Sequence, residues 1–282
     1  MAAVALRAVC VALVAAAFLA SVAGCQQTNE RMYVTQQRMD TGLIVSLDGI
    51  GGYDWGPRWL RSGLDEAGCT SAIVIYDWSK GWTGFWIGDL WAQERNHAVA
   101  RDLAHLIMSY EAAEPGRPVT IIGHSGGGAV VVWALEALPD DCKVERAILL
   151  APALSPDYDL SKALRAVRSR LYVTYSHGDV GTMAVGTEAL GTMDGKHSVS
   201  AGLTGFSLPA QPADIQQYAK VRQIGWTWSQ WKITDWGDHM SWTTTRFARD
   251  YLAPIIAGKT DPGTPLVPVQ AATGTAPAAG RG

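Results

Sequence analysis

Residues 123–127 read Gly-His-Ser-Gly-Gly and hold one hydroxyl, that of Ser125, among glycines. The apolar run Val119 to Ile122 precedes them, and a helical pattern over Gly126 to Leu138 follows. A sharp turn from strand to helix strains its central residue and crowds the flanking positions, so larger side chains would clash there. Such a turn exposes the serine Oγ at a helix N-terminus, where backbone N–H groups favour developing negative charge. The pattern predicts that Ser125 acts as a nucleophile.

The strand, the Gly-x-Ser-x-Gly turn and the helix together resemble the nucleophile elbow of the α/β-hydrolase family. The resemblance covers Gly42 to Ala257 and is weakest from Val180 to Gln230. It implies an acid and then a histidine later in the chain, because a serine hydroxyl needs a base that removes its proton. Asp179 follows an apolar run directly, where the family places its acid, and His239 precedes the last helical run, where the family places its base.

Other residues compete for these two roles. Asp194 is the alternative acid, and Asp179 is favoured because it follows a strand directly. His177 and His197 are the alternative bases, although His177 lies too close in sequence to Asp179 for two separate loops to bring them together. Asp238 is expected to cap a turn. The remaining histidines are expected inside helices or in the serine turn itself: His97, His105 and His124.

The tetrahedral intermediate of acyl transfer also needs N–H donors for its oxyanion. The resemblance implies that the Gly126 amide is the first donor. The second donor is expected from the loop after the first strand, Leu-Asp-Gly-Ile-Gly-Gly, where relatives often begin with His-Gly. Here Asp48 stands before Gly49, so the Gly49 and Ile50 amides both remain candidates.

Two other uses of a glycine-rich turn are excluded. A phosphate-binding P-loop needs lysine where His124 stands, and Asp54 occupies the third glycine position of a dinucleotide fingerprint. The cysteines and histidines are scattered without the spacing of metal ligands. We therefore expect no metal and no cofactor.

Short apolar runs alternate with helical patterns, as in parallel α/β folds. The runs are almost continuously apolar, which is typical of strands covered on both faces. We predict an α/β-hydrolase fold with a mostly parallel central sheet, helices on both faces, and a lid or insertion around residues 180–230. The expected strands are Leu43 to Leu47, Ala72 to Tyr76, Val119 to Ile122, Ala147 to Ala151 and Leu171 to Tyr175. The expected helices are Pro57 to Ala67, Leu90 to Ala112, Gly126 to Leu138, Leu160 to Ser169 and Ser241 to Ile256.

Tryptophans are frequent, at 12 of 282 residues, and several follow the first two strands. The carboxyl ends of parallel strands form the ligand-binding edge of an open sheet. Trp82 and Trp86 are therefore predicted to bind substrate, and flat apolar rings favour an acyl chain, an aromatic group or an esterified sugar. Other members of the group are Trp55, Trp59, Trp78 and Trp91.

The N-terminal segment is predicted to be a processing signal. Arg7 precedes a short apolar stretch, and Val22-Ala23-Gly24-Cys25 resembles the lipobox of bacterial lipoproteins, which implies a lipid on Cys25. An ordinary secretory signal is the alternative. The apolar stretch is too short to span a bilayer well, because spanning needs roughly 20 residues. The predicted location is the cell envelope, on the exported side of a membrane.

The rest of the chain divides by composition. We expect a signal peptide over residues 1–24, a flexible tether over 25–41, the hydrolase domain over 42–257 and a disordered tail rich in Pro, Ala, Gly and Thr over 258–282. Within the domain, Cys69 and Cys142 are expected as buried free thiols, and an exported compartment would permit a bridge between them.

These features predict an exported, lipid-anchored serine hydrolase that cleaves carboxylic esters through an acyl-enzyme. The expected partners are a small-molecule, lipid or glycan ester and the membrane that holds the lipid. Nucleic acid is excluded, because 23 basic and 26 acidic residues leave a net charge of -3 without a basic run. The alternatives are a catalytically idle binding module of the cell envelope, and a thioesterase or acyltransferase that uses the same residues.

Overall fold

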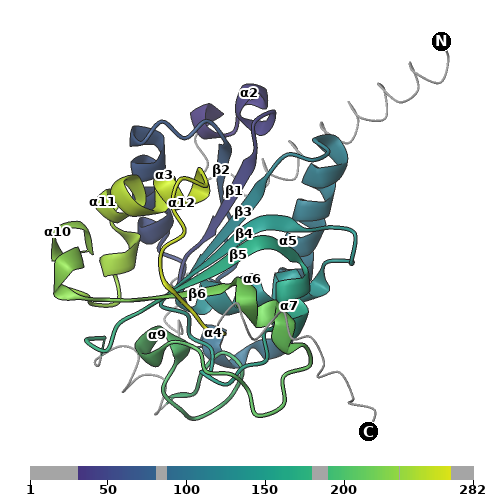
Figure 1. The fold of residues 1–282 in the computed structure, drawn as a ribbon. Helices are drawn as coiled ribbons and strands as arrows, with labels where there is room; N and C mark the ends of the chain where they lie inside the picture. The colour runs from purple at the N-terminus through teal and green to yellow at the C-terminus, as the bar shows by residue number, and fades with distance from the viewer. Residues whose placement is uncertain (1–30, 81–87, 180–189, 235, 268–282) are drawn as a thin grey trace, which may run out of the picture.

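A twisted central sheet organises the molecule (Figure 1). The computed structural model describes residues 31–80, 88–179, 190–234 and 236–267. These residues form a seven-stranded sheet in the order β2-β1-β3-β4-β5-β6-β7, in which only β7 runs antiparallel to its neighbour. The predicted mostly parallel sheet is confirmed. The strands are β1 Leu43–Leu47, β2 Ala72–Ile75, β3 Val119–His124, β4 Val144–Leu150, β5 Val167–Tyr175, β6 Val221–Gly225 and β7 Thr264–Pro265.

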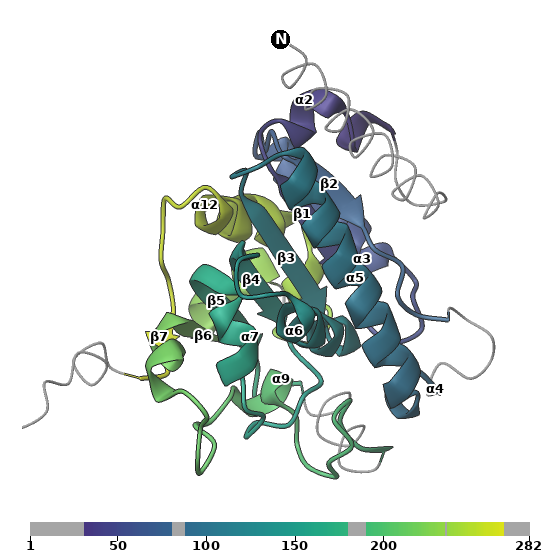
Figure 2. The ribbon, with the colours of Figure 1, turned by 90° about the vertical axis from the view of Figure 1, so that its right-hand side faces the viewer.

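Helices cover both faces of the sheet, as predicted (Figures 1 and 2). Two separate apolar clusters fill the space between the sheet and its helices. One face carries α5 Gln93–Ala113, α6 Gly126–Ala137 and α7 Ser161–Arg165. The other carries α3 Trp55–Glu66, α11 Thr245–Phe247, the π-helical turn η6 Ala248–Leu252 and α12 Ala253–Ile256. Shorter elements are η1 Arg31–Tyr33, α2 Gln36–Met39, α4 Gly88–Trp91, α9 Ala201–Thr204, η3 Ile215–Lys220, η4 Trp228–Gln230, α10 Trp231–Thr234 and η5 Ser241–Thr243.

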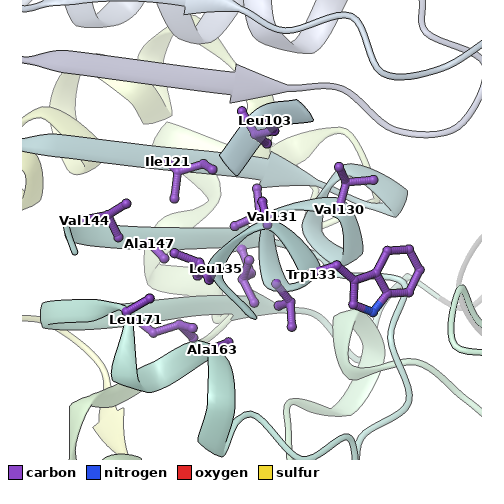
Figure 3. Packing of buried hydrophobic residues seen from close by; sticks show 14 of the residues in the cluster. Leu103, Ile121, Val130, Val131, Trp133, Leu135, Val144, Ala147, Ala163 and Leu171 are labelled. Carbon is purple, nitrogen blue, oxygen red and sulfur yellow. The ribbon is translucent and has the colours of Figure 1, made fainter. Parts of the chain in front are cut away.

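Helix α6 is buried on all sides, and Figure 3 shows its packing. Val131 and Leu135 are in the same cluster as Ile121 of β3 and Leu103 of α5. A helix that is apolar all round is stable only inside a core. The helix that begins next to Ser125 is therefore fixed on every side.

Two predicted boundaries around residue 165 are wrong. The helix expected over Leu160 to Ser169 ends at Arg165, and strand β5 begins at Val167 rather than Leu171. After the buried Val167, the next three residues of β5 are polar and exposed or only partly covered, so this part does not read as a buried strand. Strand β6 was not predicted from the sequence, because Arg222 and Gln223 interrupt its apolar pattern.

The residues before the domain differ from the flexible tether expected over 25–41. Thr35 caps α2, and the Met39 side chain is buried in the core. Arg38 donates to the carbonyl oxygens of Cys69 and Ser71 and pairs with Asp65. Residues 31–41 are therefore folded against the domain, while Cys25 lies outside the described residues.

The start of the tail is also ordered. β7 pairs with β6, and Val267 is buried against the core. The Asp261 carboxylate bonds to Arg170 and Tyr172 and lies 3.4 Å from Arg222 Nε. The disordered tail expected over 258–282 is thus absent up to residue 267, and residues 268–282 lie outside the described chain.

The segment expected as a lid or insertion, residues 180–230, covers most of the connection from β5 to β6, strand β6 itself and the turn η4. Its residues 180–189 lie outside the described chain. From residue 190 onward the segment packs along the loop that follows β4, where the Ala201 and Gly202 amides donate to Leu154 and Pro152. Its buried side chains belong to the main core: Met193, Ala201, Leu203, Phe206 and Tyr218. The described part is therefore built into the domain and includes the sheet strand β6.

Two further expectations concern cysteines and membrane spans. Cys69 and Cys142 are free, and burial raises the pKa of both thiols. In the part of the chain that the structure describes, no helix has the length and apolar character needed to cross a bilayer.

Candidate active site

Ser125 sits in a strained turn between β3 and α6. Its backbone has φ 52° and ψ −120°, a region that residues other than glycine rarely occupy. A Cβ on Gly123 would collide with the Gly127 carbonyl oxygen, and a Cβ on Gly127 would collide with the Asp48 carbonyl oxygen. The two glycines are therefore required by close backbone approach, as the crowding argument predicted.

Asp179 and His239 meet beside this turn. Asp179 follows β5 and is buried, and its Oδ2 lies 2.7 Å from His239 Nδ1. A carboxylate oxygen accepts hydrogen bonds, so Nδ1 carries the proton and Nε2 remains as the basic nitrogen. The structure thus brings the predicted acid and base together.

The loop that carries His239 is held by local contacts. Asp238 Oδ1 accepts bonds from the Met240 and Ser241 amides, which is the capping role expected for it. The Trp226 ring lies against Gly237, where a Cβ would collide with it. Trp226 follows the unpredicted strand β6, so its supporting role could not be read from the sequence.

The serine turn and the histidine loop are in direct contact. His124 Nε2 lies 3.0 Å from the His239 carbonyl oxygen, and the two imidazole rings are 4.6 Å apart between centroids. Within the described residues, Ser125 Oγ makes no hydrogen bond to His239. Proton transfer therefore requires the ring and the hydroxyl to approach each other, which catalytic groups often complete only with substrate.

The competing residues lie elsewhere. Asp194 accepts bonds from the Ser155 amide and hydroxyl. His177 lies edge-on to the Tyr175 ring, and His197 would contact a Cβ on Gly191. His97 packs against a tryptophan, and both His97 and His105 line a groove along α5, away from Ser125.

The candidate oxyanion donors differ in their hydrogen bonds. Gly126 opens helix α6, so its N–H has no partner within the helix. The Gly49 N–H donates to Asp48 Oδ1 over 2.8 Å. Ile50 N–H makes no hydrogen bond within the described residues, and the Ile50 side chain lies against Gly126. The geometry favours Ile50 over Gly49 as the second donor.

A buried carboxylate that sequence reasoning missed holds this loop. Asp89 accepts bonds from the Gly51 amide, 3.2 Å, and the Ser79 hydroxyl, 2.5 Å. Arg95 lies 3.3 Å from Asp89 Oδ1 and donates to the Trp78 carbonyl oxygen over 2.6 Å. These partners come from the loops after β1 and β2 and from helix α5, so no spacing in the sequence signals the network.

The tryptophans divide into buried and exposed groups. Trp78 is buried against Gly126 and donates to the Asp48 carbonyl oxygen over 2.7 Å. Trp59 is 43% exposed and lines a cavity of about 400 Å³ together with Asp238 and Met240, the sequence neighbours of His239. The predicted substrate residues Trp82 and Trp86 lie outside the described residues.

Electrostatics favour a neutral base. Burial lowers the pKa of His239 below its usual value, and this outweighs the opposing effect of the hydrogen bond that His239 donates to Asp179. The neighbouring His124 lowers it further. Across the first loop, burial raises the pKa of Asp54 to about 6, and the carboxylates of Asp77 and Asp48 add to the shift. Among the described residues, no cluster of side chains suits a metal ion.

Comparison with known proteins gives one family match. A family model described as serine aminopeptidase, S33, matches residues 73–253, a range that contains Ser125, Asp179 and His239. No curated protein matches the chain.

Several solved structures are similar to the chain. Aspergillus fumigatus lipase B aligns with 13% identity and a TM-score of 0.49 over 86% of this chain, which spans only 58% of the lipase. A putative aryl esterase from Burkholderia cenocepacia aligns with 15% identity and a TM-score of 0.46, over 78% of this chain and 91% of its own. A lipase-esterase related protein from Clostridium acetobutylicum ATCC 824 aligns with 12% identity and a TM-score of 0.44, over 77% and 94% of the two chains.

Proposed function

The chain belongs to the serine aminopeptidase S33 family and is a serine hydrolase, and from this premise we propose that it cleaves carboxylic esters through Ser125, His239 and Asp179. The observation that carries the proposal is the 2.7 Å contact of His239 Nδ1 with Asp179 Oδ2, on a loop that touches the serine turn. A buried carboxylate that orients a neutral imidazole is what activation of a serine hydroxyl requires.

The reaction begins when Ser125 Oγ attacks the ester carbonyl carbon and its proton passes to His239 Nε2. The carbonyl oxygen becomes an oxyanion that accepts hydrogen bonds from the Gly126 and Ile50 amides. His239 then gives its proton to the departing alkoxide, which leaves an acyl group on Ser125. Water attacks this acyl-enzyme with the same help from His239, and the acid and free serine are released.

Asp179 has two roles toward the His239 imidazole. It holds the Nδ1 proton, so that Nε2 faces its partners as a base, and it stabilises the imidazolium that forms in each half-reaction. Its burial at 3% exposure supports this role, because a carboxylate kept from water interacts more strongly with the ring.

The substrate is proposed to be an ester with an apolar or bulky group. A cavity lined by Trp59 of α3 and Met240 of the histidine loop, together with polar side chains, supports apolar contacts near this loop. Trp82 and Trp86 are proposed to extend these contacts, since they follow the same strand as the buried Trp78.

The protein is further proposed to be exported and held at a membrane by a lipid on Cys25. This part is supported by the sequence Val22-Ala23-Gly24-Cys25 and the basic, apolar segment before it. The proposed location is the cell envelope, on the exported side of the membrane.

A fluorophosphonate probe and a panel of substrates test the proposed activity. We expect the probe to label the wild type and not Ser125→Ala, and nitrophenyl esters of graded chain length to be cleaved faster than amino-acid arylamides. An idle binding module would leave the serine unlabelled. Faster cleavage of the arylamides would replace the ester proposal by the aminopeptidase activity that the family description names, and transfer of the acyl group to an added alcohol or thiol would reveal a transferase.

A further inference from the structure

A groove of mixed chemistry lies between helix α3 and the loop that carries His239. It is lined by Trp59 of α3 and by Asp238 and Met240, the two sequence neighbours of His239. The remaining lining residues are Ser241, Thr244 and Thr245. Its volume is about 400 Å³, within the range of sites for small ligands. We call this space the α3 groove.

Polar groups in the α3 groove remain available to a ligand. Asp238 Oδ1 accepts bonds from the Met240 and Ser241 amides, but Asp238 Oδ2 accepts no hydrogen bond within the described residues. The Thr245 hydroxyl and the Trp59 indole N–H likewise have no hydrogen-bond partner in the described part of the chain. The groove therefore presents a flat aromatic ring together with a free acceptor and free donors.

This combination matches a sugar ring better than an acyl chain. A sugar ring has an apolar face of C–H groups that can lie on an indole, and its hydroxyls both donate and accept hydrogen bonds. An acyl chain in the groove would take water from the Asp238 carboxylate and the Thr245 hydroxyl without replacing its hydrogen bonds, which costs free energy. Apolar contact alone therefore does not explain the lining.

Charge argues against two other occupants. The described lining contains one acidic and no basic side chain, so the anionic headgroups of a bilayer would be repelled. A cationic group would pair with Asp238, but an ammonium only donates and would leave the Thr245 hydroxyl and the Trp59 N–H without an acceptor. A neutral ligand that carries hydroxyls satisfies all of these groups.

The start of α3 exposes further aromatic rings next to Trp59. Trp55 stands one helical turn before Trp59 and is also exposed. Its ring centroid lies 5.4 Å from that of the exposed Tyr53. Contiguous exposed apolar surface of this kind marks binding sites on soluble proteins. The α3 groove is thus part of a surface that suits a ligand with several flat faces.

We infer that the α3 groove binds a sugar ring and that the alcohol released by the enzyme is a hydroxyl of that glycan. The inference rests on the proposed function and names the alcohol part of its ester. His239 gives its proton to the departing oxygen, so the alcohol part lies on the side of the histidine loop, and this loop lines the groove.

The reaction then removes an acyl group from a glycan. Ser125 Oγ bonds to the acyl carbon, the bond from this carbon to the sugar oxygen breaks, and the sugar oxygen takes the proton from His239. The glycan leaves with a restored hydroxyl. Water hydrolyses the acyl-enzyme to the free acid.

A matched pair of acetate esters tests the inference by kinetics. Methyl glucoside acetylated at its primary hydroxyl and cyclohexylmethyl acetate share the acyl group and have rings of similar size, but only the first carries hydroxyls. We expect kcat/KM of the wild type to be at least about tenfold higher for the sugar ester. Trp59→Leu keeps an apolar side chain without a flat face and should abolish this preference, mainly through a higher KM. Trp59→Phe restores a flat face and should keep most of it.

Trp228→Ala is the control, because it removes an exposed tryptophan that does not line the groove, and it should keep the wild-type preference. A wild type without the preference, a preference that survives in Trp59→Leu, or equal losses in Trp59→Leu and Trp59→Phe would overturn the inference. A fall in Trp59→Leu only for a long-chain ester in phosphatidylglycerol vesicles would assign the groove to a bilayer and would also overturn it.

A binding measurement separates this inference from the proposed function, since it needs no activity. Ser125→Ala should be retarded in native gels that contain acetylated xylan or acetylated glucomannan, and adding Trp59→Leu should weaken this binding at least about fivefold. Absence of retardation in both gels would overturn the inference even in an enzyme that the fluorophosphonate probe labels. An unlabelled wild type with retardation that depends on Trp59 would overturn the proposed function and leave the sugar site in place.

Discussion

The Asp179 carboxylate lies 2.7 Å from the imidazole Nδ1 of His239, although the two residues are 60 positions apart in the chain. Asp179 follows β5, and His239 lies in the loop before η5. Parallel strands bring such loops to one edge of the sheet, where the turn of Ser125 also lies. The topology of the sheet therefore brings these two residues together. Each property of the pair can be tested separately.

The pH profile reports the base. Because burial lowers the pKa of His239, the ring is neutral at pH 7 and takes a proton only in more acidic solution. A protonated ring cannot accept the Ser125 proton, so kcat/KM should fall as the pH drops through a midpoint below about 6.5, the usual histidine value. Asp54→Asn is the control, since the pKa of Asp54, about 6, lies in the same range. A midpoint well above the usual value would contradict the assignment of His239.

A methyl group in the serine turn should damage the fold. Gly127→Ala places a Cβ against the Asp48 carbonyl oxygen, so we expect a loss of about 2 kcal/mol or more in the free energy of unfolding and a large fall in kcat. Gly88→Ala is the matched control, because a Cβ there meets no atom of the described residues within 4 Å. Urea unfolding of both variants checks the prediction, and equal stability would show that the backbone approach is not tight.

The buried carboxylate of Asp89 should control the oxyanion loop. Asp89→Ala removes the acceptor of the Gly51 amide and Ser79 hydroxyl and takes the carboxylate partner away from Arg95. We expect about a tenfold lower kcat and a loss of about 1–3 kcal/mol in stability. Asp102→Asn, at an exposed position of α5, should change neither quantity. A variant with wild-type kcat would assign Asp89 to stability alone.

The lipid anchor is tested at Cys25. Cys25→Ser should release the protein from membranes of a bacterial host and block incorporation of labelled palmitate, because serine offers no thiol for the lipid. Activity of the purified variant on a soluble ester should match the wild type. Unchanged membrane partition and labelling would rule out the anchor.

The tryptophans after β2 are tested by substrate size. Trp82→Ala or Trp86→Ala should lower kcat/KM for a bulky or long-chain ester about tenfold, near 1.4 kcal/mol, and leave acetate esters almost unchanged. Trp228→Ala, at a side chain 69% exposed, is the control. An equal fall for both esters would indicate a distorted site, and no fall for either would remove both residues from the substrate contacts.

Strand prediction from the sequence succeeded where both faces of a strand are covered. β1 and β3 are buried along their whole length, so their apolar runs are continuous. β6 was missed because Arg222 and Gln223 find their partners in distant segments, at Asp261 and at the Phe206 backbone. Hydrophobic periodicity cannot identify a strand whose polar residues find their partners elsewhere in the chain.

The residues of the site also divide into those that the sequence predicts and those that depend on contacts between distant segments. Ser125 could be predicted because its turn is local, and Asp179 and His239 because chain order in a family resemblance locates them. The contacts of Asp48 with His124 and of Asp89 with Gly51 depend on loops that only the folded sheet brings together. The choice between Gly49 and Ile50 was open for that reason, since it depends on where the Asp48 carboxylate points.

If Cys25 carries the proposed lipid, the packing of α2 against the domain limits which way the enzyme can face. α2 leads directly into the first residue of β1, at the end of the strand opposite the serine turn, so strand β1, roughly 16 Å long, separates them (Figure 1). Only residues 26–30 then remain between a lipid on Cys25 and the folded chain, a reach of roughly 17 Å where the whole tether would have given roughly 45 Å. A protein held so closely by that end would turn its catalytic edge outward, toward molecules of the surrounding compartment and away from the bilayer that holds it.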